Sequence, residues 1–276
     1  MTHRTYLDEN MNDPVVVPFC GGEVGIISRR SPDKDTANED AAAIFAVSDA
    51  SGLLVVADGM GGSRGGESAA RITLEELALE VDSTTSESVR ESALRAVESA
   101  NQRILDLGVG AGCTLAMAEI DGSSFRPYHI GDAGLLLVGG RGKIKKLTLS
   151  HAPVAYAVES GMLDEIEAMH HDDRHIVTNC LGHADMRIEM GSPITMMARD
   201  TLVLASDGLF DNLHIDEISA VVRRGPLDDA IRELMRRCRE RQAGAEPETP
   251  SKPDDTTLVI YRPSRIAASR TATTID

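Results

Sequence analysis

Two stretches far apart in the chain share one pattern: LLVVADG at residues 53–59 and TLVLASDG at 201–208. In each, a continuous apolar run passes directly into an Asp-Gly pair, and such a run is typical of a β-strand that is buried on both faces. A carboxylate at the end of a buried strand is costly unless it is ion-paired or bound to a metal. One such stretch is ordinarily a strand that ends in a turn, but two of the same form indicate a shared site.

Two further acidic groups also lie beside predicted strands. Asn38-Glu39-Asp40 precedes a strand expected at 41–47, and Asp254-Asp255 precedes one expected at 257–261. No His or Cys accompanies these acids, so the ions that they would bind are hard: Mg²⁺, Mn²⁺ or Ca²⁺ rather than Zn²⁺. Two such ions held roughly 4 Å apart would share a water and convert it into hydroxide near neutral pH. That arrangement suits in-line hydrolysis of a phosphate ester.

The rest of the chain mixes short strands with helices. Helical spacing predicts helices at 67–81, 86–107, 215–223 and 227–241, and strand patterns lie at 15–19, 25–28, 114–120, 125–130, 135–138 and 144–148. The four strands between 114 and 148 have the turns of a β-meander. Residues 1–13 are polar and are expected to be frayed, whereas 151–186 form a polar, histidine-bearing and partly helical segment.

Composition excludes several classes of protein. The 276 residues are 42% hydrophobic and carry a net charge of −16, which argues against a nucleic-acid partner. The four cysteines are scattered, so they indicate neither a disulfide framework nor a zinc site and fit a reducing cytosol. We see no signal peptide and no apolar run approaching the roughly 20 residues that span a membrane. We therefore expect a cytoplasmic protein that does not bind membranes.

Six motifs taken together resemble those of the metal-dependent Ser/Thr protein phosphatases of type 2C, in their bacterial form. They are NED (38–40), ADGMGG (57–62), GCTLA (112–116), HIGDA (129–133), SDGLFDN (206–212) and PDDTTLVI (253–260). The resemblance implies an α+β fold, a central sandwich of two antiparallel β-sheets flanked by α-helices on both outer faces (α-β-β-α). The strand pattern alone does not distinguish this fold from a parallel α/β sheet.

The resemblance also implies a domain organisation. We expect an N-terminal extension and first strand at 1–19, a single catalytic domain at 20–262 and a disordered tail at 263–276. Within the catalytic domain, residues 151–186 resemble the flap that lies beside the active site in this family.

The resemblance further implies a ligand set for Mn²⁺ or Mg²⁺. Asp58 would bridge two core ions, and the Gly59 carbonyl would bind one of them. Asp207 and Asp254 would bind the second ion, with Glu39 contributing through water and Asp40 supporting the cluster. Asp132 would hold a third, weaker ion together with Asp207. The catalytic nucleophile would be a metal-held water positioned by Asp58 and Asp207.

Two positions depart from the family pattern. An Arg that grips the substrate phosphate usually lies three residues before the Asn of NED, where this chain has Asp35, and an Asp would repel a phosphate. Candidate replacements are Arg29, Arg30 and Lys34, although each is also an ordinary surface charge. Met60 stands where many animal relatives have a catalytic His, so the general acid is not identified. The histidines of the flap-like segment are expected on the surface: His151, His170, His171, His175 and His183.

These observations predict an enzyme that hydrolyses phosphoserine and phosphothreonine in proteins. We expect a monomer whose substrates are targets of a Ser/Thr kinase. A narrower alternative is an enzyme dedicated to one small regulatory phosphoprotein. A second alternative is a non-catalytic, phosphatase-like domain that binds a phosphoprotein; Asp35 and Met60 favour it. The intact acids Glu39, Asp58, Asp207 and Asp254 favour the enzyme.

Overall fold

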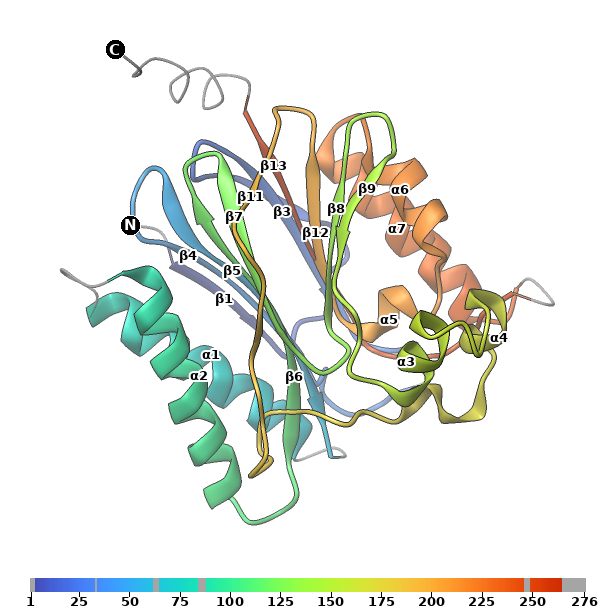
Figure 1. The fold of residues 1–276 in the computed structure, drawn as a ribbon, viewed down its shortest axis with the longest axis horizontal. Coiled ribbons are helices and arrows are strands. Elements are labelled where there is room, and N and C mark those ends of the chain that lie inside the picture. Colours follow the sequence, from blue (N-terminus) through green and yellow to red (C-terminus); the bar gives the residue numbers. More distant parts are fainter. Residues whose placement is uncertain (1–2, 33, 62–64, 84–87, 246–248, 265–276) are drawn as a thin grey trace.

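The computed structural model describes residues 3–32, 34–61, 65–83, 88–245 and 249–264. In this part of the chain the strands form two antiparallel sheets that pack face to face, with helices over both outer faces (Figure 1). The predicted α-β-β-α sandwich is therefore confirmed, and the parallel α/β sheet that the strand pattern left open is excluded.

Each sheet draws its strands from distant parts of the sequence. The first contains, in spatial order, β1 (His3–Leu7), β4 (Asp40–Ala46), β5 (Ser51–Met60), β6 (Gly112–Asp121) and β7 (Ser124–Ile130), with the short strands β10 (Glu189–Met190) and β11 (Ile194–Thr195) both pairing with β7. The second contains β2 (Val15–Phe19), β3 (Gly22–Arg29), β13 (Thr256–Pro263), β12 (Thr201–Ala205), β8 (Gly134–Val138) and β9 (Ile144–Leu147).

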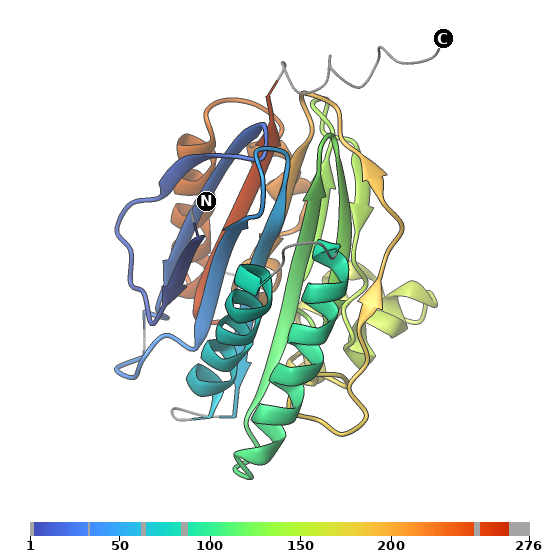
Figure 2. The same cartoon turned by 90° about the vertical axis from the view of Figure 1, so that its left-hand side faces the viewer.

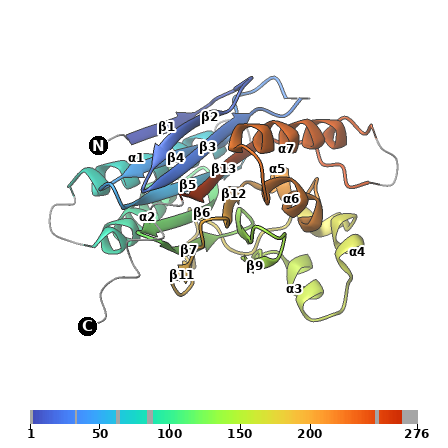
Figure 3. The same ribbon diagram turned by 90° about the horizontal axis from the view of Figure 1, so that it is seen from above.

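Four of the helices form the outer layers. Helices α1 (Gly66–Ser83) and α2 (Val89–Asp106) cover the first sheet, as Figure 2 shows in teal. Helices α6 (Ile215–Val222) and α7 (Leu227–Gln242) cover the second sheet. The smaller helices α3 (Pro153–Glu159) and α4 (Glu165–Met169), with the 3₁₀ turn η1 (Asp172–His175), lie at the opposite end of the molecule from α1 and α2 (Figure 3). The one-turn helix α5 (Asp207–Phe210) follows β12 directly.

The two apolar runs are continuous because their strands are buried on both faces. In β5, Leu53, Val55 and Ala57 pack toward α1 and α2, whereas Leu54 and Val56 pack between the sheets. In β12, Leu202 and Leu204 pack between the sheets, while Val203 and Ala205 pack toward α6 and α7. Successive side chains of a strand point to opposite faces, so a strand in the middle of four layers needs apolar residues at every position. Burial of this kind contributes about 1.5–3 kcal/mol for each large apolar side chain.

Two expectations about the strands were wrong. The N-terminal residues expected to be frayed include β1, which pairs with β4 at the edge of the first sheet from His3 opposite Phe45 to Leu7 opposite Ala41. The strands predicted as one meander belong to two hairpins, because β6 and β7 pair in the first sheet and β8 and β9 in the second. The chain crosses between the sheets at Gly131, whose φ of +89° only glycine adopts without strain.

The expected tail begins one residue before the last strand ends, because β13 extends to Pro263. The remainder of that segment, 265–276, lies outside the described residues. Among the residues that the structure describes, no helix is both long enough and apolar enough to cross a membrane.

Candidate metal centre

Carboxylates from both sheets meet at one end of the sandwich. Asp40 begins β4 and lies directly opposite Asp58 in β5. In the second sheet, Asp207 follows β12 and Asp254 precedes β13, and these two strands are paired. Asp132 lies in the crossover from β7 to β8, between the two sheets. The structure therefore brings together five acids that are up to 214 positions apart (254 minus 40), as the sequence predicts.

The proximity of these acids opposes their ionisation. Burial raises the pKa of Asp58 well above its usual range, and the negative charges of Asp207, Asp40, Asp132 and Asp254 raise it further. Burial and the charge of Asp207 raise the pKa of Asp132 to about 7, and the same two causes raise that of Asp254 to about 7. Such a group of acids stays ionised at neutral pH only if cations balance it. This electrostatic state is expected at a metal centre.

Asp40 connects the two sheets by hydrogen bonds. Its Oδ2 accepts a hydrogen bond of 2.7 Å from the Ser206 hydroxyl, which in turn accepts one of 3.0 Å from the backbone N–H of Thr257. The backbone N–H of Asp40 donates to Oδ1 of Asn38 at 2.9 Å. Asp40 is thereby fixed in place beside Asp58, as its predicted supporting role requires.

Glu39 and Gly59 form a close-fitting oxygen-rich site. The backbone N–H of Gly59 donates to the Glu39 carbonyl at 3.2 Å, and Oε1 of Glu39 is buried without a hydrogen-bond partner. A Cβ atom on Gly59 would lie 2.2 Å from the carbonyl oxygen of Gly66, and one on Gly66 would lie 2.5 Å from that same Oε1. Only glycines permit this close approach. An unpaired buried carboxylate oxygen among oxygen ligands fits a hard divalent cation.

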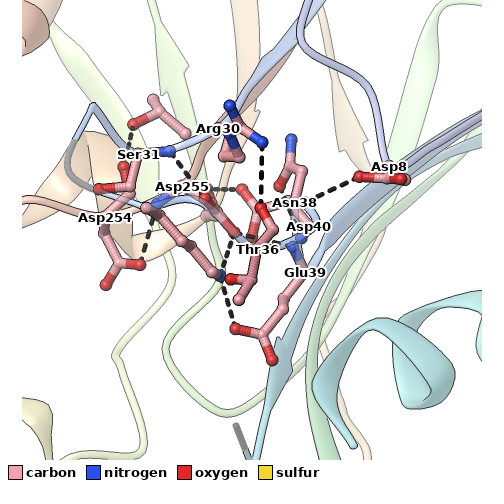
Figure 4. Close-up of polar contacts among 12 residues, drawn as sticks. Asp8, Arg30, Ser31, Thr36, Asn38, Glu39, Asp40, Asp254 and Asp255 are labelled. Atoms are coloured by element: carbon pink, nitrogen blue, oxygen red, sulfur yellow. Dashed lines mark hydrogen bonds and ion pairs between the residues drawn. The ribbon is translucent and has the colours of Figure 1, made fainter. Parts of the chain in front are cut away.

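Asp255 fixes the loop that carries Glu39, a role that sequence reasoning missed. Its carboxylate accepts hydrogen bonds of 2.7 Å from the backbone N–H groups of Ser31 and Glu39, and its Oδ2 lies 2.7 Å from Nζ of Lys34 (Figure 4). Nζ of Lys34 also contacts Oε2 of Glu39 at 2.5 Å. The adjacent acids Asp254 and Asp255 were a signal for this second role.

Sequence reasoning also missed Asp211 and Lys252. Nζ of Lys252 forms ion pairs with Asp207, with Asp211 at 2.8 Å and with Asp254 at 3.5 Å. Asp211 lies four residues after Asp207, at the end of the one-turn helix, so the motif SDGLFDN contained its signal. Lys252 lies in a polar linker that offered none.

The three cations proposed to grip phosphate have different surroundings. Lys34 contacts Glu39 and Asp255, as described above. Arg30 donates a 3.3 Å hydrogen bond to the Thr36 carbonyl. Arg29 has the strand parity of Ile27, which packs toward α6 and α7, and its charge acts on Arg239 of α7. Of the three, only Lys34 has a contact with a carboxylate of the centre among the described residues.

A separate group of potential metal ligands consists of His129, His151 and Glu189, whose ligand atoms lie within 4.8 Å of one another; it is the one such group in the described part of the chain. Nε2 of His129 lies 2.9 Å from the Leu149 carbonyl, which can only accept, so this nitrogen carries a proton. Nδ1 of His151 accepts from the Gly131 N–H at 3.0 Å. Its proton is therefore on Nε2, 3.2 Å from Oε2 of Glu189. In this arrangement of hydrogen bonds Nε2 of both histidines carries a proton, so neither of these two nitrogens is a metal ligand.

Among the described histidines and cysteines, we find no side-chain nucleophile at the centre. The expectation of a surface position is wrong for His151, which is 1% exposed, and holds for His170, His175 and His183; His171 is half-buried. Burial, followed by the charge of Asp58, raises the pKa of Cys113, and burial raises that of Cys180. A neutral buried thiol is a poor nucleophile, so neither cysteine suits a phospho-enzyme mechanism.

Comparisons with family models, with related sequences and with solved structures all indicate the same family. Residues 29–248 match the model of the family described as protein phosphatase 2C. A putative protein phosphatase 2C-type of Streptococcus pyogenes is 34% identical over 193 residues, which are 66% of this chain and 78% of that protein. The structure of the S. agalactiae serine/threonine phosphatase superposes with a TM-score of 0.76 at 27% identity, covering 87% of this chain and 99% of that one.

The fold of a further solved structure is also similar. It is the catalytic domain of the serine threonine protein phosphatase PstP in complex with 2 manganese ions, with a TM-score of 0.70, 23% identity, and coverage of 87% of this chain and 96% of that one. At this level of identity the likeness concerns the fold. The family match, the relative and the arrangement of Asp58, Asp207 and Asp254 agree, and the chain belongs to the protein phosphatase 2C family of enzymes.

Proposed function

We propose that this protein hydrolyses phosphoserine and phosphothreonine esters in proteins, in a reaction that depends on divalent metal ions. The observation that carries the proposal is the convergence of Asp58, Asp207 and Asp254 from two sheets on one point, beside an unpaired buried oxygen of Glu39. Such a set of oxygen ligands suits Mn²⁺ or Mg²⁺.

The proposed roles of the residues follow the ligand set given above. Asp58 and the Gly59 carbonyl hold one core ion, and Asp58 also reaches the second. Asp207 and Asp254 hold the second ion, with Glu39 contributing through water. Two features support these roles: among the acids, Asp207 has the largest effect in raising the pKa of Asp58, and Asp40, opposite Asp58, is held by Ser206.

Divalent ions bound at this centre supply Lewis acidity, which activates a water for in-line attack and neutralises charge on the phosphoryl group. The protein contributes orientation, because Asp58 and Asp207 extend from the ends of two rigid strands. It also contributes a cation near the phosphate. Lys34 is the best placed of the three proposed, since its ammonium already lies beside Glu39. Arg30 contacts the Thr36 carbonyl and Arg29 acts on Arg239, so these two cations are the alternatives to Lys34.

The ion requirement has support from outside the chain, since the solved structure of the PstP catalytic domain holds two manganese ions. We propose two core ions, Mn²⁺ or Mg²⁺, for this protein as well. The proposed substrates are phosphorylated proteins that a Ser/Thr kinase modifies. A monomeric state and a cytoplasmic location remain predictions.

Hydrolysis of p-nitrophenyl phosphate tests the proposal. With Mn²⁺ present we expect release of p-nitrophenol, and EDTA should abolish it. Asp254→Asn should lower the rate, whereas Asp200→Asn should not. Asp200 is a matched control, because it is a buried acid paired with Lys145 at 2.6 Å and belongs to no part of the centre. Folded protein without metal-dependent turnover would refute the enzyme and favour the non-catalytic phosphoprotein-binding domain.

A further inference from the structure

Lys252 places a positive charge inside the acidic centre. Its Nζ contacts Asp207, Asp211 and Asp254, and its side chain is only 18% exposed. Most exposed lysines extend into water and gain little from an ion pair. Three carboxylates around one ammonium make a different arrangement, in which a cation of the chain itself balances part of the negative charge.

The backbone holds Lys252 at this position. The N–H of Lys252 donates to Oδ1 of Asn212 at 2.9 Å, and Nδ2 of Asn212 donates to the Lys252 carbonyl at 2.9 Å. Asn212 is fully buried and also donates to the Gly208 carbonyl at 2.9 Å. Nη2 of Arg174 donates to the carbonyl of the preceding Ser251 at 2.9 Å. The lysine is thus tied to the same turn that carries Asp207, and its side chain starts beside the carboxylates that it contacts.

The contacts of Lys252 lie on one side of the centre. Its ion-pair partners in the described part of the chain do not include Asp58 or Glu39, the acids proposed for the first core ion. They do include Asp207 and Asp211, which lie at the two ends of the one-turn helix α5. Lys252 therefore neutralises Asp207, Asp211 and Asp254 together, and Asp207 is one of the two acids, with Asp132, that are expected to hold a third ion.

We propose that the ammonium of Lys252 takes the place of a third divalent ion at the Asp132, Asp207 and Asp211 side of the centre, so that the protein binds two ions and not three. This inference rests on the proposed function, since it concerns the same metal centre. Because this cation is part of the chain, it loses no translational entropy when it pairs with the acids, and a chelator cannot remove it. A divalent ion arriving at these acids would have to displace the ammonium or lie close to it, and like charges at such distances repel strongly.

The core ions are compatible with this arrangement. Lys252 contacts Oδ2 of Asp207 and Oδ2 of Asp254, and Oδ1 of Asp254 accepts a 2.9 Å hydrogen bond from the Asp255 N–H. Asp254 is the most distant of the three partners. Lys252 therefore weakens the binding of the second core ion less than it would weaken the binding of an ion at Asp211.

Counting bound Mn²⁺ tests the inference without relying on activity. Calorimetric titration, with the electron paramagnetic resonance of free Mn²⁺ as a second readout, should give about two ions per wild-type chain. For Lys252→Met we expect about three ions, with the weakest bound at least about tenfold tighter than any third ion in the wild type, because one repelling charge is gone. Lys252→Arg keeps the charge and should behave as the wild type.

Lys145→Met is the matched control, because Lys145 also forms a partly buried ion pair, with Asp200, and that pair involves none of the acids of the centre. It should bind as many ions as the wild type, with the same affinity. Three ions of similar affinity in the wild type would overturn the inference even if Lys252→Met failed to fold. An unchanged titration of folded Lys252→Met would do the same.

Failure of the inference can be told from failure of the proposed function. Hydrolysis of p-nitrophenyl phosphate by the wild type that needs Mn²⁺ but occurs with three bound ions would overturn the inference alone. Hydrolysis that EDTA does not affect would overturn the proposed function. A gain of a third ion in Lys252→Met would then still support the role of the lysine in ion binding.

Discussion

Single carboxylates at this centre differ in what they do. Asp58, Asp207 and Asp254 are directed at the shared point, whereas Asp255 points to the loop before β4 and accepts hydrogen bonds from the backbone of Ser31 and Glu39. The second group of contacts fixes Glu39, whose Oε1 is left without a partner. Two consecutive acids just before β13 thus have separate tasks, because the loop before β4 binds the Asp255 carboxylate whereas Asp254 contacts Lys252.

Asp255→Asn should lower both the unfolding free energy of the protein and its affinity for metal ions. The amide cannot accept through its nitrogen, so at least one charge-assisted hydrogen bond is lost, at a cost of about 1.5–3 kcal/mol of unfolding free energy. Because Glu39 is then held less firmly, we expect Mn²⁺ affinity to fall about 10–100-fold, as for other residues that orient metal ligands. Urea unfolding and calorimetric titration measure the two effects.

Asp200→Asn is the control for that change. Asp200 is also buried and accepts from a backbone N–H, that of Met197 at 2.8 Å, and from Lys145 at 2.6 Å. It should lose comparable stability but keep its Mn²⁺ affinity. Equal loss of affinity in both variants would mean that Asp255 acts through general stability.

The sequence pointed to the acids that the structure brings together, but not to the residues that support them. Asp58 and Asp207 were identifiable because an apolar run ends in each of them. Lys252 was not, because nothing in the linker before β13 distinguishes a lysine that folds back onto Asp207 from one in water. Asn212 and Asp255 belong to two of the motifs, but the motifs do not indicate what these residues contact. Their hydrogen bonds depend on which distant backbone groups come near them.

Among the elements, the segment 151–186 shows how a long connection is fixed at its ends. At one end, the N–H of His151 donates to the Gly131 carbonyl at 2.9 Å, and Nδ1 of His151 accepts from the Gly131 N–H at 3.0 Å. At the other, Leu181 exchanges backbone hydrogen bonds with Cys113 of β6. The part between, with α3 and α4, is mostly exposed. The segment therefore has a fixed base and an exposed middle, which agrees with its resemblance to a flap.

His151→Ala should disturb the turn that carries Asp132. The substitution leaves the buried N–H of Gly131 without a partner, which costs about 1–3 kcal/mol, and opens a cavity beside Asn179. We expect lower stability in urea. His183→Ala, at an exposed position of the same segment, should change it by less than about 0.5 kcal/mol. Equal stability of both variants would contradict the anchoring role.

Element prediction succeeded where burial determined the pattern. The strands around Leu54 and Val203 were predicted because every residue is apolar, which is what a strand between two packed layers requires. The edge strand β1 was missed, since only one neighbour pairs with it and its exposed residues read as an unfolded end. The crossover at Gly131 was also missed, because the sequence of a turn does not determine which sheet the next strand joins.

Across the whole molecule, the two sheets contribute to one site and one core, so stability and metal binding are linked. Anything that binds the folded chain alone stabilises it. Removal of the metal ions and protonation of the acids should therefore both lower the free energy of unfolding through this centre. The contribution of a titrating group elsewhere has to be measured by comparing variants.

Acid should destabilise the protein partly through His129. Burial lowers the pKa of His129, and the charges of His151 and Lys146 act in the same direction, against the hydrogen bond to Leu149 and the charge of Glu189. The folded state binds this proton less readily than the unfolded state does. The stability contributed by the neutral ring is therefore complete above the usual pKa of about 6.5 and falls as the pH drops toward the folded-state pKa.

The measurement is the unfolding free energy of the wild type and of His129→Gln between pH 7.5 and 5, both with Mn²⁺. The acids of the centre titrate in both proteins, so their difference reports on His129. We expect the wild type to lose more stability, by up to about 1.4 kcal/mol per pH unit. Parallel pH profiles would rule out this contribution.

The central claim is that the acids of both sheets bind metal ions that hydrolyse a phosphate ester. The most direct test is phosphate release from a phosphothreonine peptide by the wild type, Asp58→Asn and Asp200→Asn, with Mn²⁺ or EDTA. We predict release by the wild type and Asp200→Asn that EDTA abolishes. In folded Asp58→Asn, release should fall about 10³-fold, because a metal ion contributes several kcal/mol to stabilising the transition state. Release that persists in EDTA, or that Asp58→Asn leaves unchanged, would contradict the account.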